Sequence, residues 1–212
     1  MRATTSASAS ASAIAAEVAA LYRVPGWKRS LDIVLGGALL VLSSPLFALC
    51  WAAVRLTSCG PALHWSERVG KDNSTFDMPK FRTMRLDTPQ LATHLLLDPE
   101  RYLTPVGKLL RKTSLDELPQ LFSVCRGRLS LVGPRPALFN QHDLIVLRTE
   151  SGVHRLLPGI TGWAQVHGRD ELEIAVKVRY DAEYMASASF SLDLKIMALT
   201  LWTVLKADGV RH

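Results

Sequence analysis

The chain has 212 residues, a length that can bury one good hydrophobic core and therefore predicts a single compact domain. Its net charge of +6 fits an anionic partner such as phospholipid, nucleotide or nucleic acid, and its mean hydropathy of +0.14 is high for 21% charged residues, which suggests membrane contact. The three cysteines are odd in number and lack metal-type spacing, so they argue against a disulfide framework or a zinc site and favour reduced thiols.

The N-terminal segment is mostly Ala, Ser and Thr. We interpret Met1–Ala13 as a disordered tail because it has little to bury. A signal peptide is the competing interpretation, but no apolar core segment follows within reach and only Arg2 is basic there. Residues Ile14–Arg23 are expected to form a short helix, so the tail and this helix occupy residues 1–23.

A long apolar run, Leu31–Val54, matches the roughly 20 helical residues that span a bilayer. Ser43, Ser44 and Pro45 lie at its middle, where proline removes a backbone hydrogen bond and bends a helix. Each half would be about 16 Å long, only half of a bilayer core. A kinked transmembrane helix and a re-entrant helix-break-helix hairpin over residues 24–58 both stay open.

Basic residues flank this apolar run on both sides, and the positive-inside tendency therefore pulls both ends to the cytoplasm, as a hairpin requires. They are Lys28, Arg29, Arg55, Arg68 and Lys71. Asp32 lies where the run enters the membrane, and an acid there is costly unless it is paired. Lys28 or Arg29 is the expected partner of Asp32.

The rest of the chain predicts an α+β fold that is predominantly helical. Ala62–Ser66 and Thr75–Met84 alternate loosely around the polar turn Gly70–Ser74, as in a small β-hairpin. The remaining expected elements are a polar connector with a Leu-rich helix (Asp87–Pro99), helices over Val106–Lys112, Glu117–Cys125, Leu138–Leu147, Glu171–Met185 and Leu192–Ala207, an extended Gly133–Pro136, and a glycine-rich loop over Pro158–Gly168. The last helix is apolar nearly all round, so it is either fully buried or lies in a membrane interface. We favour partial contact with the interface, as one of the interfacial amphipathic helices around the catalytic domain.

Two adjacent carboxylates, Asp116 and Glu117, have two interpretations. Ser114 and Glu117 have the spacing of a capping box, in which Glu117 would only close the start of a helix. Pro119 argues against that register, because it would break a helical hydrogen bond, whereas a start at Asp116 leaves the proline in the first turn. There the helix dipole favours ionised Asp116, which can act as a nucleophile while its neighbour holds Mg²⁺ or moves a proton.

Basic residues surround this pair, and their usual explanation is a solvated surface. They include Lys80, Arg82, Arg111, Lys112, Arg126, Arg128 and Arg135. Arg135 is the exception, because the flanking prolines reduce the entropy lost in fixing it and its planar fork suits a phosphate.

The glycine-rich loop also has two interpretations. Gly159, Gly162 and Gly168, with Arg169, could bring backbone close to a nucleotide, or the glycines could only shape a turn. Among the six scattered histidines, His167 inside this loop is the candidate of interest.

Several segments in a fixed order resemble the bacterial sugar transferases that are monotopic phosphoglycosyl transferases (polyprenyl-phosphate sugar-1-phosphate transferases). The likeness runs from about Lys28 to Gly209. It is carried by KRSLD (28–32), SP (44–45), ERVG (67–70), KFRTM (80–84), LLRKTSLDELPQLF (109–122), LSLVGPRP (129–136), PGITGWAQVHGR (158–169) and SLDLKI (191–196).

The resemblance implies an enzyme that moves a sugar 1-phosphate from a UDP-sugar to undecaprenyl phosphate and releases UMP, with Mg²⁺ as cofactor. It implies that Asp116 attacks the phosphate bearing the sugar and forms a covalent aspartyl-phosphosugar, and that Glu117 handles a proton or, with Asp116, the metal. Two displacements through one aspartate predict ping-pong kinetics. The reaction would be the first membrane step of exopolysaccharide, O-antigen or glycoprotein glycan assembly.

The same resemblance implies roles for other residues. Those expected to bind substrate phosphates are Lys80, Arg82, Arg111, Arg135 and Arg169, and those of the nucleotide loop are Gly159, Gly162, Gln165 and His167. Lys28, Arg29 and Asp32 are expected at the lipid head groups, and Ser44-Pro45 at the turn of the re-entrant hairpin. Residues 59–212 then form a membrane-associated catalytic domain on the cytoplasmic face of the bacterial inner membrane.

The chain departs from the family pattern at Ser66, where glutamine is usual, at Ala188, where an aromatic is usual, and at His167, where asparagine is common. It also lacks the extra N-terminal membrane bundle of larger members. A scaffold that has lost turnover is a rival function, against which the intact Asp116, Glu117 and Arg135 speak. A nucleic-acid partner is not expected, because no aromatic-basic binding motif is present. The sequence leaves the sugar and a homodimer open.

Overall fold

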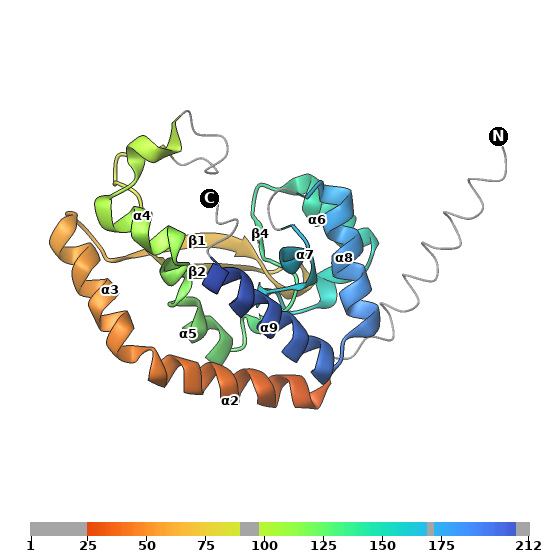
Figure 1. Cartoon of the computed structure of the whole chain (residues 1–212). Coiled ribbons are helices and arrows are strands. Elements are labelled where there is room, and N and C mark those ends of the chain that lie inside the picture. The colour runs from red at the N-terminus through yellow and green to blue at the C-terminus, as the bar shows by residue number, and fades with distance from the viewer. Residues whose placement is uncertain (1–24, 90–97, 169–171, 207–212) are drawn as a thin grey trace.

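The computed structural model describes residues 25–89, 98–168 and 172–206 (Figure 1). The expected tail and helix of residues 1–23, most of the Leu-rich connector segment and Arg169 lie outside the described residues. Within them the fold is α+β and mostly helical, with one three-stranded and one two-stranded sheet, which confirms the predicted fold class.

The apolar run forms two helices, α2 (Gly26–Leu42) and α3 (Ser44–Thr57), which meet at a bend of 58°. The break falls at Ser43, one residue before the predicted Ser44-Pro45 turn, and the Ser44 hydroxyl donates to the Val41 carbonyl. Proline is tolerated here because it lies in the first turn of α3. No single helix in the described ranges is long and apolar enough to cross a membrane, although this bent pair passes the test of length and composition together.

The predicted β-hairpin is present as β1 (Leu63–Val69) and β2 (Thr75–Phe81), joined by a 3₁₀ turn at Lys71–Asn73. A third strand, β4 (Ala137–Leu138), pairs antiparallel with the end of β1. This strand and the helix α6 (His142–Glu150) replace the helix predicted over Leu138–Leu147, because Gln141 Oε1 accepts from the Leu138 backbone N–H and delays the helix start.

A second, parallel sheet joins β3 (Ser130–Val132) to β5 (Gly159–Thr161). The predicted loop over Pro158–Gly168 is therefore a strand followed by the short helix α7 (Trp163–Val166). A Cβ at Gly159 or Gly162 would collide with the backbone of Gly133, so glycine is required for these segments to approach. This outcome agrees with the structural alternative for the two glycines.

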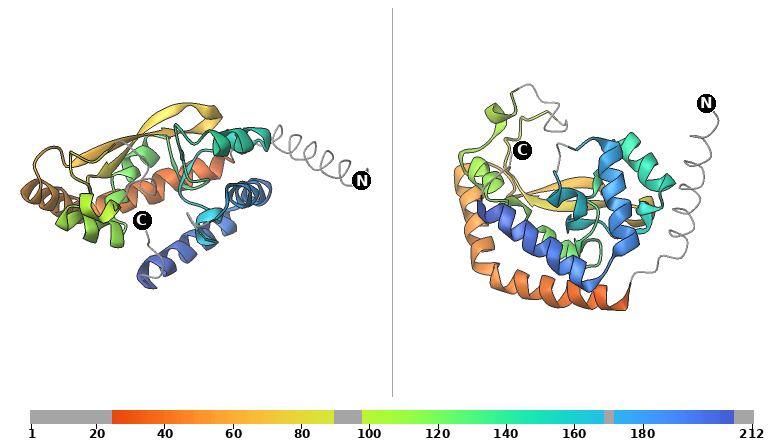
Figure 2. Two further views of the ribbon diagram at one scale, coloured as in Figure 1. Left: turned by 90° about the horizontal axis from the view of Figure 1, so that it is seen from above. Right: turned by 45° about the vertical axis from the view of Figure 1, so that its right-hand side comes forward.

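The other helices pack around these sheets. They are η3 (Pro99–Tyr102), α4 (Pro105–Lys112), η4 (Leu115–Glu117), α5 (Gln120–Cys125), η5 (Val153–Arg155), α8 (Ile174–Ser187) and α9 (Phe190–Lys206). Thr104 caps α4 as predicted, since its hydroxyl oxygen accepts from the Gly107 N–H. In Figure 1, α2 and α3 border the molecule below and at the left, and the second view in Figure 2 shows α9 lying between α2 and α8.

The main core lies where α2 and α5 meet the two sheets, α8 and α9. Its most buried members include Val124, Leu129, Val132, Tyr184 and Ile196. A second cluster under α3 and α4 includes Val54, Phe81 and Leu110. The two cores share Leu118, on the segment that carries the carboxylate pair, so this segment is fixed from both sides.

Candidate active site

The carboxylate pair lies on η4, between α4 and α5. Ser114 has a left-handed backbone (φ 57°) and makes no side-chain capping hydrogen bond, so the capping-box interpretation is wrong. Pro119 directly precedes α5 with φ −60°, where its missing N–H costs no helical bond. The predicted helix start at Asp116 is wrong, because α5 begins at Gln120 and Asp116 lies in the preceding 3₁₀ turn. The local chain therefore holds Asp116 and Glu117 in a tight 3₁₀ turn instead of using them as caps.

The Glu117 carboxylate is ion-paired with two cations from different parts of the chain. Its Oε1 accepts from Lys80 Nζ of β2 at 2.7 Å and from Arg135 Nη2 at 3.2 Å. Only 16% of the Glu117 side chain is exposed, against 17% for Lys80 and 31% for Arg135. Because partial burial weakens solvent screening, these contacts fix the carboxylate more firmly than a surface pair would.

Asp116 is buried, and its Oδ1 has no hydrogen-bond partner among the described residues. Burial raises the pKa of its carboxyl to about 6; Glu117 adds to the rise, while Lys80 and Arg111 oppose it. A partly desolvated carboxylate with a lone pair free and cations close by is suited to attack an electrophilic phosphorus. The prediction that these two residues form one site with Lys80, Arg111 and Arg135 agrees with this geometry.

Arg111 approaches the pair from α4. Its Nε donates to Thr83 Oγ1 at 2.9 Å, and burial lowers the pKa of the guanidinium while Asp116 opposes this change. Arg82 was predicted to join the same set, but it is buried elsewhere and donates to the carbonyls of Ser58 and Cys59. Arg82 thus satisfies carbonyls just beyond the end of α3 and is not available for a phosphate in this structure.

Two residues that the sequence interpretation missed share the face of the sheet that carries Lys80. His64 pairs directly with Lys80 across β1 and β2, and Arg68 lies four residues further along β1. Arg68 donates from Nε to Ser66 Oγ. Burial, Lys80 and Arg68 all lower the pKa of His64. The period of two along β1 could have indicated this shared face.

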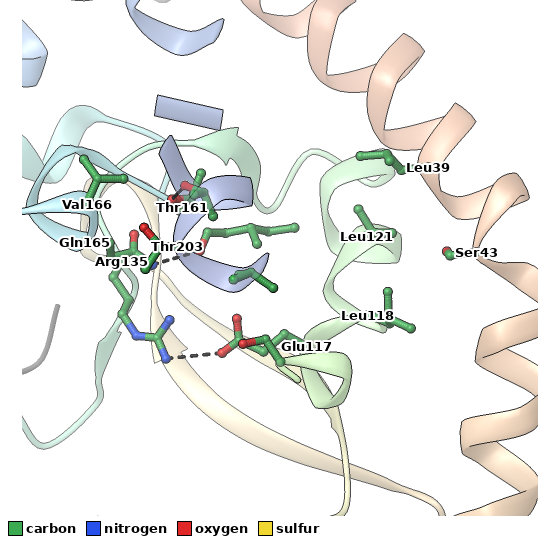
Figure 3. A pocket seen from close by; sticks show the side chains of 14 residues that line it. Leu39, Ser43, Glu117, Leu118, Leu121, Arg135, Thr161, Gln165, Val166 and Thr203 are labelled. Atoms are coloured by element: carbon green, nitrogen blue, oxygen red, sulfur yellow. Dashed lines mark hydrogen bonds and ion pairs between the residues drawn. The ribbon is translucent and has the colours of Figure 1, made fainter. Parts of the chain in front are cut away.

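A cavity of about 290 Å³ lies on the other side of Glu117. Figure 3 shows Glu117 and Arg135 at one end, with side chains from α2, α5, β5, α7 and α9 around it. Gln165 borders this cavity, its Nε2 donates to the Ile160 carbonyl, and its Oε1 has no partner in the described part of the chain. His167 does not line the cavity. Its ring stacks on Tyr180 and meets Trp163 edge-on.

Comparison with known proteins identifies the family. The family model described as "Bacterial sugar transferase" matches residues 23–207. The chain belongs to this family. The match includes every described residue of the site, from the α2–α3 pair to α9.

Individual relatives are similar over most of this transferase. It is 42% identical to the uncharacterized sugar transferase EpsL of Bacillus subtilis, over 87% of this chain and 90% of that protein. It is 36% identical to a UDP-N-acetylgalactosamine-undecaprenyl-phosphate N-acetylgalactosaminephosphotransferase of Aeromonas hydrophila, over 87% of this chain. It is 38% identical to the UDP-glucose:undecaprenyl-phosphate glucose-1-phosphate transferase of Escherichia coli, over 82% of this chain. The match covers only 45% and 39% of the last two proteins.

The residues of the transferase that were predicted to meet lipid head groups lie differently. Lys28 is buried and pairs with Asp193 at 2.6 Å, and Asp32 is buried and accepts from Ser130 Oγ and the Leu131 N–H. Of the two expected partners of Asp32, Lys28 interacts with it electrostatically, but the hydrogen bonds of Asp32 go to Ser130 and Leu131.

Arg29 donates from both terminal nitrogens to carbonyls at the end of α5, those of Val124 and Cys125. Together with the burial of Lys28 and Asp32, this makes the KRSLD segment of the transferase an anchor between α2 and the core instead of a head-group contact. Local sequence could not indicate these contacts, because the partners lie about a hundred or more residues away in the sequence.

The carboxylate pair of the transferase fits a Mg²⁺ ion that is shared with a substrate. No group of three or more His, Cys, Asp and Glu within residues 25–89, 98–168 and 172–206 could hold a metal alone. However, Mg²⁺ commonly uses one or two carboxylates and takes its other ligands from phosphates and water. The unpartnered Asp116 Oδ1 and the neighbouring Glu117 offer this donor set.

Proposed function

We propose that the protein transfers a sugar 1-phosphate from a UDP-sugar to undecaprenyl phosphate, yielding undecaprenyl-diphosphate-sugar and UMP. The observation that carries the proposal is the buried, unpartnered Oδ1 of Asp116 beside Lys80 and Arg111. The relatives named as undecaprenyl-phosphate sugar phosphotransferases support the substrate classes. Because those names differ in the sugar, the sugar itself stays open.

In the first step, an oxygen of ionised Asp116 attacks the phosphorus that bears the sugar. A new Asp–O–P bond forms, the bond from that phosphorus to the bridging oxygen breaks, and the electron pair leaves with UMP. Lys80 and Arg111 lie close enough to Asp116 to act on its pKa, and their positive charges can stabilise the negative charge that develops on the phosphate oxygens. The product is an aspartyl-phosphosugar.

In the second step, a phosphate oxygen of the lipid acceptor attacks the same phosphorus and the bond to Asp116 breaks. The carboxylate of Asp116 is regenerated, and the sugar phosphate is now joined to the acceptor through a diphosphate. Glu117 borders the cavity and contacts Arg135, so it can accept the proton of a monoprotonated acceptor phosphate. Two sequential displacements give ping-pong kinetics.

We further propose that Mg²⁺ assists this reaction, with Asp116 and Glu117 as its protein ligands. When bound, the ion supplies positive charge to the phosphates of the donor. A metal in this place would compete with protons for the buried carboxylate and lower the pKa of Asp116. Chelation is therefore expected to reduce activity and to leave the fold intact, since the core does not depend on these residues.

We propose that α2 and α3 form a re-entrant membrane hairpin, so that the protein is monotopic with its site on the cytoplasmic face of the inner membrane. Large apolar side chains are exposed along both helices, including Val34, Val41, Leu42, Leu49 and Leu56. A row of this kind fits a lipid environment better than water. An active site held at the membrane surface would be accessible both to a lipid phosphate and to a soluble nucleotide sugar. The reaction would start a glycan such as an exopolysaccharide.

The nucleophile assignment is tested with the variant Asp116→Asn. The full chain is purified in detergent or nanodiscs, and UMP release is measured with a panel of UDP-sugars, undecaprenyl phosphate and Mg²⁺. We expect the variant to lose UMP release, because an amide cannot form the acyl phosphate. The matched control, Asp143→Asn on the exposed surface of α6, should keep full activity. Full activity of Asp116→Asn would refute the assignment.

A further inference from the structure

The two sides of the carboxylate pair differ in chemistry. Asp116 interacts electrostatically with Lys80 and Arg111 and does not line the cavity of about 290 Å³, whereas Glu117, which is ion-paired with Lys80 and Arg135, borders it. The wall of that cavity is mostly apolar. Its apolar members are Leu39, Leu118, Leu121, Ile160, Val166 and Val204 (Figure 3).

Three threonines, Thr161, Thr200 and Thr203, belong to the remaining wall, but their hydroxyls are hydrogen-bonded inside the protein. Thr161 Oγ1 and Thr200 Oγ1 lie 2.6 Å apart in a hydrogen bond, and Thr200 also donates to the Ile196 carbonyl. Thr203 Oγ1 donates to the Leu199 carbonyl. With these donors already engaged, this part of the wall offers little to a polar ligand.

The cavity continues toward the exposed apolar surface of the bent helix pair. Leu39 and Ser43 form its wall at the end of α2, beside the break, and Leu39 is 46% exposed. The end of α9 forms the facing wall through Thr203 and Val204. A ligand that fills the cavity can therefore reach charged groups at one end and the apolar surface of the hairpin at the other.

We propose that this cavity binds the isoprene units next to the phosphate of the polyprenyl acceptor, with the acceptor phosphate held at the Arg135 end. The inference rests on the proposed function and deepens it, because it assigns the acceptor to the cavity and the donor to the side of Lys80 and Arg111. A volume near 290 Å³ is at the lower end for small-molecule sites. Only the first isoprene units fit, and the rest of the chain extends along the hairpin into the bilayer.

The sugar of the donor is the alternative occupant, and the wall argues against it. A hexose presents many hydroxyls, and each one buried without a partner carries a desolvation cost. Among the described residues on the cavity wall, Gln165 Oε1 is the one buried side-chain atom without a partner. Away from the charged end at Glu117 and Arg135, the wall offers few partners for the hydroxyls of a sugar ring, whereas a branched hydrocarbon needs none. Arg135 supplies the positive charge that an acceptor phosphate requires.

The test uses a matched pair of Val→Trp variants in the full chain, reconstituted in nanodiscs. Val204→Trp fills the cavity from α9, whereas Val146→Trp places the same indole on the exposed surface of α6. Two half-reactions are measured with the most active UDP-sugar: the burst of UMP without acceptor, and the KM for undecaprenyl phosphate at saturating donor. We expect Val204→Trp to raise the acceptor KM about tenfold, since overpacking a site weakens binding, and to keep the UMP burst. Val146→Trp should change neither.

Two outcomes would overturn the proposal. Loss of the UMP burst in Val204→Trp, with its fold intact by circular dichroism, would assign the cavity to the donor. An unchanged acceptor KM would show that the cavity binds neither substrate. Leu39→Trp changes the opposite wall of the cavity and therefore controls for a local effect on α9. It should also raise the acceptor KM.

A binding measurement separates failure of this inference from failure of the proposed function. A prenyl phosphate that carries a benzophenone is photo-crosslinked to the wild-type protein, and the adducts are located by mass spectrometry. We expect adducts at residues 200–204 and 39–43, competed away by undecaprenyl phosphate. These adducts without any UMP release would support the cavity assignment and refute the transferase activity. Adducts confined to the outer surface of the hairpin would refute the cavity assignment.

Discussion

The site residues show which part of a sequence prediction depends on residue type and which part depends on the fold. Asp116, Glu117, Lys80 and Arg135 were predicted from their chemistry and order, and the structure brings them together. Arg82 was expected with them from the family resemblance. However, β2 ends at Phe81, and the side chain of Arg82 turns to the end of α3. Where β2 ends, and which carbonyls lie near Arg82, depend on the tertiary structure and not on the local sequence.

The raised pKa of Asp116 gives a pH dependence for the first half-reaction. The nucleophile must be ionised, and burial raises its pKa to about 6. We expect the rate of the UMP burst without acceptor to fall as the pH decreases through the pKa of Asp116 and to level off above it, with the midpoint at or below about 6 because bound Mg²⁺ would lower this pKa. Because Lys80 lowers this pKa, Lys80→Met should move the midpoint to higher pH, apart from any loss of donor binding. A burst rate that stays constant as the pH is lowered from about 8 to about 4, the ordinary pKa of an aspartate, would contradict this expectation.

The same raised pKa means that ionised Asp116 lowers the free energy of unfolding. A folded-state pKa near 6 exceeds the unfolded value of 3.8, so the folded protein prefers the protonated form and loses stability as the pH rises through 6. The loss at pH 8 amounts to about 3 kcal/mol. We expect Asp116→Asn to raise the free energy of unfolding at pH 8 by up to this amount, and the difference from wild type to vanish near pH 4. Urea titrations in micelles measure both, and a less stable Asn variant at pH 8 would contradict the argument.

At the scale of elements, most helices and the hairpin follow from local patterns, whereas the contacts between elements do not. The proline and serine break, the β1–β2 hairpin and the cap of α4 are local and were predicted. The strands β4 and β5 are two and three residues long, too short for a period-two pattern to mark them. Their existence depends on pairing with β1 and β3, which lie elsewhere in the sequence.

A buried hydrogen-bond and ion-pair network connects α2 to α8 and α9, and no local sequence pattern indicates it. Lys28 Nζ contacts Asp193 Oδ2 at 2.6 Å and Tyr184 Oη at 2.9 Å, and Tyr184 also donates to Asp193 Oδ1 at 2.7 Å. All three residues are nearly fully buried. The network ties the start of the hairpin to the helix that forms one wall of the cavity, so its integrity should matter to the acceptor site.

Removal of one partner should therefore destabilise the fold strongly. Asp193→Leu leaves the ammonium of Lys28 buried without its counter-charge, a loss of about 3–5 kcal/mol in unfolding free energy. The double variant Lys28→Met/Asp193→Leu removes both charges and should recover much of this loss. Chemical denaturation in micelles measures the three proteins. Equal stability of wild type and Asp193→Leu would show that the pair contributes nothing.

Across the whole molecule, Glu117 of the carboxylate pair lies between the cations Lys80 and Arg135 and an apolar cavity that adjoins the bent helices (Figure 3). The family resemblance predicted the two substrates but gave no place to the acceptor, which we assign to the cavity. η4 is packed between both cores through Leu118, and Glu117 borders the cavity whereas Asp116 does not. In a ping-pong reaction, UMP leaves before the acceptor reacts with the aspartyl-phosphosugar, so the acceptor would enter the cavity after the first product has gone.

The membrane arrangement of the whole chain is tested by the accessibility of the two ends of the helix pair. In a background with Cys50, Cys59 and Cys125 replaced by alanine, single cysteines are placed at Ser30 and at Thr57, both exposed on α2 and α3. A re-entrant hairpin returns to the side it entered, so both positions should be protected from an impermeant maleimide in spheroplasts and should be labelled once the inner membrane is opened. A kinked span through the bilayer would instead expose one of the two in intact spheroplasts. That result would refute the hairpin and would place the ends of the bent pair on opposite sides of the membrane.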